Sequence, residues 1–131
     1  MYQVKDVMTD RVYAVRAEAT IDDAISLLLD HQVSGLPVVD DQGLLIGVIT
    51  ELDIIDLVYD ADIEPSIVRE YMTRDVSSLD DDASLDEAAS FFCNNTIRRI
   101  PIVRDGLLVG VLSRRDLIGF LRGVRKQPQA K

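Results

Sequence analysis

Residues 33–53 read V-S-G-L-P-V-V-D-D-Q-G-L-L-I-G-V-I-T-E-L-D, and residues 97–116 repeat the pattern as I-R-R-I-P-I-V-R-D-G-L-L-V-G-V-L-S-R-R-D. Each copy has a short apolar run with an internal proline, an acidic turn with glycine, and a second apolar run. A hydroxyl residue then stands three places before an aspartate. Gln42 has no counterpart, so the second turn is one residue shorter. An internal repeat of this kind indicates two copies of one supersecondary unit.

The repeat extends upstream of both stretches. V-K-D-V-M-T at residues 4–9 matches V-R-E-Y-M-T at residues 68–73, and T-I-D-D-A at residues 20–24 matches S-L-D-E-A at residues 84–88. Because either half would be marginal by itself, we expect the two halves to share a core. The residues predicted to be buried in it are Ile21, Leu28, Leu36, Val38, Ile46, Val48, Leu85, Phe92, Ile100, Ile102, Val109 and Val111. The predicted divisions are a first repeat at residues 1–60, a linker at 61–67, a second repeat at 68–122 and a basic, polar tail at 123–131.

Composition narrows the class of protein. The chain has 131 residues, which is one ordinary domain by length, and no apolar run approaches the ~20 residues that span a bilayer. The N-terminus lacks the apolar segment of a signal peptide. The single cysteine, Cys93, excludes an internal disulfide and favours a cytoplasmic location. Since Cys93 stands in an apolar helical stretch, we expect it to be a buried core residue.

The charge distribution argues against nucleic acid as a partner. The net charge is −9, whereas duplex binding requires a basic surface. Residues 1–65 hold 3 basic and 14 acidic side chains, and residues 66–131 hold 11 and 9. Two interpretations stay open: solvated faces with a basic tail, or arginines that the second half presents to an anion.

Hydrophobic periodicity predicts the same elements in both halves. Each half should hold a short strand, an amphipathic helix, two strands joined by a turn and a second helix. In the first half these fall at residues 12–15, 21–32, 36–39, 44–49 and 51–58. In the second half they fall at residues 76–79, 85–95, 100–103, 107–112 and 114–121. The predicted helix N-caps are Thr20, Thr50, Ser84 and Ser113.

The pairs Thr50 with Asp53 and Ser113 with Asp116 allow two interpretations. A hydroxyl residue at the N-cap with a carboxylate three places later resembles a capping box, which satisfies free backbone amides. The same geometry also suits a nucleotide. A helix N-terminus attracts phosphate, and an aspartate one turn later can accept hydrogen bonds from the ribose hydroxyls.

The order of the elements, the V-S-G-L-P-V-V-D run and the doubled Thr/Ser-x-x-Asp ending resemble tandem cystathionine β-synthase (CBS) domains, the pair known as a Bateman module. The resemblance covers about residues 4–121. It implies an α/β (α+β) fold of two β-α-β-β-α repeats packed through their sheets with pseudo-twofold symmetry. It also implies two clefts that bind adenosine-containing ligands such as AMP, ADP, ATP or S-adenosylmethionine.

The resemblance further implies that each cleft combines residues from both repeats. Cleft A would be lined by Thr9, Tyr13, Val33, Ser34, Gly35, Ser113, Arg114 and Asp116. Cleft B would be lined by Thr73, Ser77, Ile97, Arg98, Arg99, Thr50 and Asp53.

Several features keep alternatives open. The guanidiniums of Arg98 and Arg99 could grip phosphates or pair with the acidic first half. The ring of Tyr13 could stack on a base or block it. His31 at a helix end has no visible second metal ligand, and the three aspartates at residues 80–82 are expected to form a solvated turn, so we predict no metal site. No constellation of nucleophile, base and oxyanion donors is evident, so we predict no catalytic residues.

We therefore expect a stand-alone regulatory module that binds an adenine nucleotide and is not an enzyme. The competing hypothesis is a structural or dimerisation module with empty clefts that acts through protein–protein contacts. We expect a homodimer or a higher closed oligomer, with head-to-tail association because the two halves carry unlike charge. A regulated enzyme or transporter is a possible further partner, and neither nucleic acid nor membrane insertion is expected.

Overall fold

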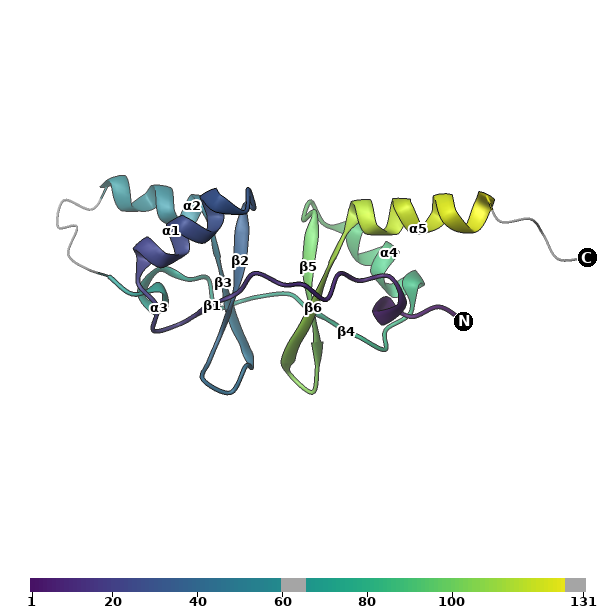
Figure 1. Ribbon diagram of the computed structural model, residues 1–131, viewed down its shortest axis with the longest axis horizontal. Coiled ribbons are helices and arrows are strands. Elements are labelled where there is room, and N and C mark those ends of the chain that lie inside the picture. The colour runs from purple at the N-terminus through teal and green to yellow at the C-terminus, as the bar shows by residue number, and fades with distance from the viewer. Residues whose placement is uncertain (60–65, 127–131) are drawn as a thin grey trace, which may run out of the picture. The chain divides into compact units, whose positions relative to one another are not determined.

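The structure is a computed structural model that describes residues 1–59 and 66–126. It has a mixed α+β architecture, which confirms the predicted fold class (Figure 1). The first repeat holds η1 (Val4–Asp6), β1 (Val15–Arg16), α1 (Ile21–Asp30), β2 (Gly35–Val39), β3 (Leu45–Thr50), α2 (Glu51–Ile55) and η2 (Asp56–Tyr59). The second repeat holds α3 (Val68–Tyr71), β4 (Leu79–Asp80), α4 (Leu85–Asn94), β5 (Arg99–Arg104), β6 (Leu107–Ser113) and α5 (Arg114–Lys126). Most of the predicted linker, and the tail beyond residue 126, lie outside the described residues.

The chain divides into two compact units that do not coincide with the two repeats. Unit 2 comprises Tyr13–Val76 with Gly106–Leu108, and unit 1 comprises Met1–Val12, Ser77–Asp105 and Val109–Lys131. Each unit therefore combines the sheet and helices of one repeat with the lead-in segment of the other. We define the lead-ins as residues 1–12 and 66–76. Unit 2 carries 3 basic and 14 acidic residues and unit 1 carries 11 and 9, so the exchange leaves the charge asymmetry unchanged.

Each unit contains a three-stranded sheet, with strand order β1-β2-β3 in unit 2 and β4-β5-β6 in unit 1. The first strand of each sheet is parallel to the second, with Val15 opposite Val38 and Leu79 opposite Ile102. Both short strands begin three residues later than predicted. A two-residue strand has no periodic pattern of its own, and its position is set by the parallel neighbour.

The helices begin where the sequence predicts. The backbone N–H of Asp23 donates to Thr20 Oγ1 at 3.1 Å, and that of Glu87 donates to Ser84 Oγ at 3.1 Å, so both hydroxyl residues are N-caps. In unit 2, α1 and α2 lie side by side (Figure 1). Helix α5 continues to Lys126, five residues beyond the predicted end at residue 121.

The buried residues form two clusters, one in each unit, and each cluster includes residues from both repeats. In unit 2, Val68 and Met72 of the second lead-in pack with the buried residues of the first repeat. In unit 1, Val4 of the first lead-in packs with the second repeat. The expected sharing of a core thus takes the form of exchanged lead-ins.

Buried and half-buried residues alternate along the strands as expected, but for β3 and β6 the prediction placed the wrong face of the strand in the core. Among the residues predicted as core, Ile21, Leu28, Leu36, Val38, Phe92, Ile100 and Ile102 are buried, whereas Ile46, Val48, Leu85, Val109 and Val111 are only half-buried. In β3 the buried positions are Gly47 and Ile49, and in β6 they are Gly110 and Leu112. Side chains alternate between the two faces of a strand, so the prediction selected the opposite face.

The prediction for Cys93 is wrong, because this residue is exposed. The buried side chains of α4 include Ala88 and Phe92, which are one helical turn apart. Cys93 follows Phe92 directly and therefore points about 100° away from that buried face.

The lead-ins are held against the sheets by paired backbone hydrogen bonds. Val48 N–H donates to Thr73 O at 2.9 Å and Thr73 N–H donates to Val48 O at 2.8 Å; Thr9 and Val111 exchange the same pair at 2.9 Å each. A Cβ added to Gly47 would lie 2.9 Å from both Met72 Sδ and Thr73 O. Glycine is needed at this position because a side chain would prevent the close approach.

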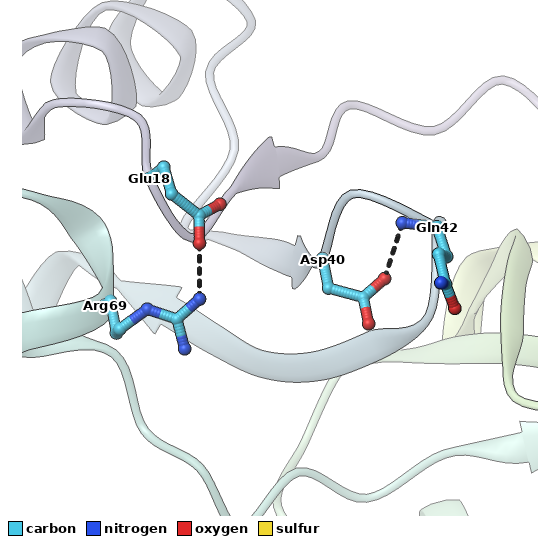
Figure 2. A network of polar contacts seen from close by, with 4 residues as sticks. All are labelled: Glu18, Asp40, Gln42 and Arg69. Carbon is cyan, nitrogen blue, oxygen red and sulfur yellow. Dashed lines mark hydrogen bonds and ion pairs between the residues drawn. The ribbon is translucent and has the colours of Figure 1, made fainter.

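An ion pair reinforces the lead-in of unit 2. Figure 2 shows Arg69 of α3 paired with Glu18. It also shows the Asp40 carboxylate, which accepts a hydrogen bond from Gln42 N–H in the β2–β3 turn. The N···O distance of this hydrogen bond is 2.9 Å. The hydrogen bond from Arg69 lowers the pKa of Glu18. Because the folded-state pKa is lowered, this stabilisation is present above the unfolded-state pKa and is lost as the pH falls through the folded-state pKa.

In unit 1 a buried carboxylate occupies a turn that was predicted to be solvated. Asp81 is only 5% exposed and accepts a hydrogen bond from Arg104 Nε at 2.8 Å. The prediction of a solvated turn at residues 80–82 is therefore wrong for Asp81. Its neighbours Asp80 and Asp82 are exposed.

We predict that Gly47→Ala lowers the free energy of unfolding by about 1–3 kcal/mol, because the new methyl group overlaps the backbone of the lead-in. The matched control is Gly119→Ala in α5, where an added Cβ has no heavy atom within 4 Å. That change should raise stability by about 0.5–1 kcal/mol, since alanine favours helix. Urea unfolding measures both. Equal effects of the two substitutions would contradict the proposed role of Gly47.

Candidate functional site

In unit 2, Thr50 and Asp53 form a complete capping box at the start of α2. Asp53 N–H donates to Thr50 Oγ1 at 3.2 Å, and Thr50 N–H donates to Asp53 Oδ2 at 2.9 Å. The Thr50 hydroxyl also lies 3.0 Å from Asp53 Oδ2. Capping thus uses one carboxylate oxygen of Asp53. The capping interpretation of this motif is correct, and it leaves the second carboxylate oxygen unassigned.

The second carboxylate oxygen of Asp53 faces the lead-in. The Thr73 hydroxyl lies 3.3 Å from Oδ1 and 3.5 Å from Oδ2, which are long distances for an O–H···O hydrogen bond. Oδ1 therefore keeps capacity to accept a better donor. The structure thus brings together Thr50, Asp53 and Thr73, three of the residues predicted for cleft B.

The V-S-G run at residues 33–35 lies beside the same helix start. Glu51 N–H donates to Ser34 O at 2.9 Å, and Gly35 is the strand partner of Thr50. Val33 packs against the core, whereas the side chain of Ser34 is exposed. Within unit 2, these residues predicted for cleft A therefore adjoin residues predicted for cleft B.

Unit 1 carries the corresponding arrangement at the start of α5. Asp116 N–H donates to Ser113 Oγ at 3.0 Å, and Ser113 N–H donates to Asp116 Oδ2 at 2.9 Å. Over residues 1–59 and 66–126, no protein donor to Asp116 Oδ1 is found. Thr9, predicted for cleft A, is held in the same unit by its backbone pair with Val111. Asp116 thus has more acceptor capacity left than Asp53.

Arg114 has a structural role in unit 1. Its Nε donates to Ile97 O and its Nη2 to Asn95 O, both at 3.1 Å, and its backbone N–H donates to Arg98 O at 3.0 Å. Its side chain therefore fixes the turn before β5. Arg98 and Arg99 are exposed, and neither has an ion-pair partner among the residues that the structure describes. Pairing with the acidic repeat, one of the two alternatives for these arginines, is not observed there.

Tyr13 stacks on His31 in unit 2. The two ring centroids are 3.7 Å apart and the ring planes differ by 13°. His31 was not predicted to take part in a site. One signal in the sequence could have indicated it. The positions that correspond to Tyr13 and His31 in the second repeat hold Ser77 and Asn95, so the aromatic pair is specific to the first repeat.

Each predicted cleft draws on both units. For cleft A, unit 2 supplies Tyr13, Val33, Ser34 and Gly35, and unit 1 supplies Thr9, Ser113, Arg114 and Asp116. For cleft B, unit 2 supplies Thr50, Asp53 and Thr73, and unit 1 supplies Ser77, Ile97, Arg98 and Arg99. The assembly of the full clefts remains a prediction. Two shallow hollows of about 490 and 560 Å³, one in each unit, include none of these residues.

Two further observations concern the described part of the chain, residues 1–59 and 66–126. No group of three or more His, Cys, Asp or Glu side chains is arranged to hold a metal ion there. None of the helices there has both the length and the apolar character that crossing a membrane would require.

Comparison with known proteins gives a consistent picture. A family model described as the CBS domain matches residues 4–60 and again residues 68–123. An uncharacterized 17.7 kDa protein of Acidianus ambivalens is 36% identical over 123 residues, covering 93% of this chain and 74% of the relative. The CBS domain-containing protein YhcV of Bacillus subtilis is 36% identical over 118 residues, covering 89% and 84%. An inosine-5'-monophosphate dehydrogenase of Methanocaldococcus jannaschii is 34% identical over 128 residues, which are 97% of this chain but only 23% of that enzyme.

The solved structures that this chain resembles include complexes with adenosine-containing compounds. CBSX2 in complex with AMP superposes with a TM-score of 0.85 at 30% identity, covering 96% of this chain and 100% of the other; a structure of CBSX2 from Arabidopsis thaliana gives a TM-score of 0.82. The CBS domain pair of protein MJ0100, in complex with 5'-methylthioadenosine and S-adenosyl-L-methionine, gives a TM-score of 0.76 at 29% identity, covering 96% and 99%.

We predict that Arg114→Lys lowers the free energy of unfolding by about 1 kcal/mol, because an ammonium group cannot reproduce the two-pronged contact with the carbonyls of Asn95 and Ile97. Arg115→Lys is the matched control, since Arg115 is exposed at the neighbouring position of the same helix. Chemical denaturation of both variants is the measurement. A loss in the control as large as in Arg114→Lys would show that the turn contact is not the cause.

Proposed function

The chain belongs to the CBS domain family, and on that premise we propose that it is a regulatory module that binds an adenosine-containing nucleotide and performs no chemistry itself. The observation that carries the proposal is the retention of both hydroxyl–aspartate pairs, each with an under-used Oδ1. A carboxylate has about four acceptor sites, so Asp53 and Asp116 can cap their helices and still accept ribose hydroxyls.

The ligand class is supported by the relatives. CBSX2 was solved in complex with AMP, and the CBS domain pair of MJ0100 was solved in complex with two adenosyl compounds. All of these ligands contain adenosine, whereas their 5' groups differ: a phosphate in AMP, a methylthioether in 5'-methylthioadenosine and a sulfonium in S-adenosyl-L-methionine. The shared chemistry therefore favours recognition through the base and the ribose. The aspartates would accept hydrogen bonds from the ribose hydroxyls.

We further propose that the ligands occupy clefts A and B as the sequence predicts, and that the clefts differ in selectivity. Cleft B includes Arg98 and Arg99, whose guanidiniums are exposed and available for phosphate. It should prefer di- or triphosphates. Arg114 of cleft A already serves two carbonyl groups, so cleft A should prefer a less charged ligand such as AMP.

A catalytic role is not part of the proposal. The match to inosine-5'-monophosphate dehydrogenase covers 23% of that enzyme, so the activity of the whole enzyme does not transfer to this chain. The single cysteine, which is exposed, suits a reducing compartment, and we propose a cytoplasmic location. The regulated partner would be an enzyme or a transporter.

The second candidate function is a dimerisation module, and exposed apolar side chains favour it as an addition to ligand binding. Unit 2 exposes Leu52, Ile55, Val58 and Tyr59 along α2 and η2, and unit 1 exposes Ile118, Leu121 and Val124 along α5. Apolar rows of this kind mark contact surfaces. Since the acidic unit 2 and the basic α5 carry unlike charge, we propose head-to-tail association of two copies.

Isothermal titration calorimetry with AMP and ATP tests the proposed ligand. We expect Asp116→Ala to weaken the AMP step about tenfold or more and Asp53→Ala to weaken the ATP step similarly, because each removes one charged hydrogen-bond acceptor. Asp22→Ala, an exposed first-turn acid of α1, should leave both steps unchanged. If both aspartate variants bind AMP and ATP as the wild type does, the two motifs are helix caps only. The dimerisation module with empty clefts would then be the favoured function.

Light scattering tests the proposed dimer. We expect a mass of twice the 14.6 kDa chain for the wild type, and the single-chain mass for Ile55→Asp, which places a charge in the apolar row of α2. Glu51→Asp on the same helix is the control and should remain dimeric. A wild-type protein that stays monomeric at high concentration would exclude the dimer.

A further inference from the structure

Tyr13 and His31 form an aromatic pair that the capping and core contacts do not explain. Their rings are nearly parallel, with centroids 3.7 Å apart. Tyr13 is 38% exposed and His31 is also exposed, so the pair lies on the surface of unit 2. His31 covers one face of the tyrosine ring, and the ring keeps solvent-exposed surface beside this contact.

His31 has a fixed place in unit 2, and Tyr13 is stacked on it. Tyr13 precedes β1 by two residues, and His31 is the residue at the C-terminal end of α1, where its backbone N–H donates to Leu27 O at 3.1 Å. The backbone of His31 is thus held by the end of α1, and the stack places the Tyr13 ring against the imidazole. Stacked aromatic rings attract each other beyond the effect of the area that they bury. The tyrosine ring is therefore held in one orientation before any ligand arrives.

The second repeat lacks the stacked aromatic pair. The repeat-related residues are Ser77 and Asn95, and Asn95 Nδ2 donates to Phe91 O at 2.9 Å instead. At that corner of unit 1 the surface has a shallow hollow of about 490 Å³, lined in part by Phe91 and Asn95. A surface platform of stacked rings therefore exists in one repeat only.

We propose that Tyr13 is a stacking platform for a planar heteroaromatic base and that His31 is a positioning residue that holds its ring. This inference rests on the proposed nucleotide-binding function and assigns the base of the cleft A ligand to the Tyr13 ring. Stacking on an aromatic side chain strengthens the binding of a base about tenfold or more. The platform would make cleft A selective for the base, while cleft B, with Ser77 at the related position, depends more on phosphate.

His31 provides a direct test of the stack in solution, because it is the only histidine of the chain. Its two imidazole C–H signals are therefore unambiguous in a proton NMR spectrum. We expect Tyr13→Leu to move both signals downfield in the ligand-free protein, since the ring current of the stacked tyrosine is lost. Unmoved signals would show that the pair does not form, and would overturn the proposal.

Binding is tested by calorimetry with AMP and with ribose 5-phosphate, which has the sugar and phosphate but no base. We expect Tyr13→Leu to weaken AMP binding in cleft A about tenfold and to leave ribose 5-phosphate binding unchanged. His31→Gln should cause a smaller loss of the same kind, and Tyr13→Phe should restore wild-type affinity. Tyr2→Leu is the control, because it removes an exposed tyrosine paired with Phe120 in unit 1.

The possible outcomes separate this inference from the proposed function. If wild-type protein binds AMP and Tyr13→Leu binds it equally well or more tightly, the ring is not a platform, whereas the nucleotide function stands. If the wild type does not bind AMP, both proposals fail. Equal weakening of AMP and ribose 5-phosphate would also overturn the platform, because the loss would then not depend on the base.

Discussion

The fold depends on the pairing of each lead-in with the sheet of the other repeat. Two backbone hydrogen bonds join Thr73 to Val48, and two join Thr9 to Val111. The close approach requires Gly47 and Gly110, and it buries Val68, Met72 and Val4 in the two cores. Each unit includes a segment of the other repeat. If the chain were cut at the linker, each isolated repeat would expose these apolar side chains or lose their partners. The tandem pair, and not the single repeat, is therefore the folding unit.

The proposed ligand chemistry uses groups that the fold has already ordered. Asp53 and Asp116 each cap a helix through Oδ2, which fixes the carboxylate in one orientation, and Oδ1 is the oxygen left for a ligand. Preorganised acceptors bind with a smaller loss of conformational entropy. The two sites are nonetheless different, because Thr73 already contacts Asp53 Oδ1 and the Tyr13–His31 stack has no counterpart in the second repeat.

Local signals predicted much of the fold. The N-caps Thr20 and Ser84 and the turn glycines Gly43 and Gly106, with φ of 85° and 82°, are identifiable from neighbouring residues alone. The exchange of lead-ins, the burial of Asp81 beside Arg104 and the contact of His31 with Tyr13 depend on partners far along the chain, so no local pattern shows them. For the site, the sequence identified the hydroxyl–aspartate pairs, but it assigned Arg114 to a ligand without detecting its two carbonyl partners.

We propose above all that the two aspartates bind ribose while they cap their helices. A crystal structure of the chain grown with saturating AMP tests this most directly. We expect AMP with its 2'- and 3'-hydroxyls within hydrogen-bonding distance of Asp116 Oδ1, or of Asp53 Oδ1 in place of Thr73. Asp116 Oδ2 and Asp53 Oδ2 should still accept from the capping amides. Electron density for AMP that lies away from both carboxylates, or no density for AMP at all, would contradict the claim.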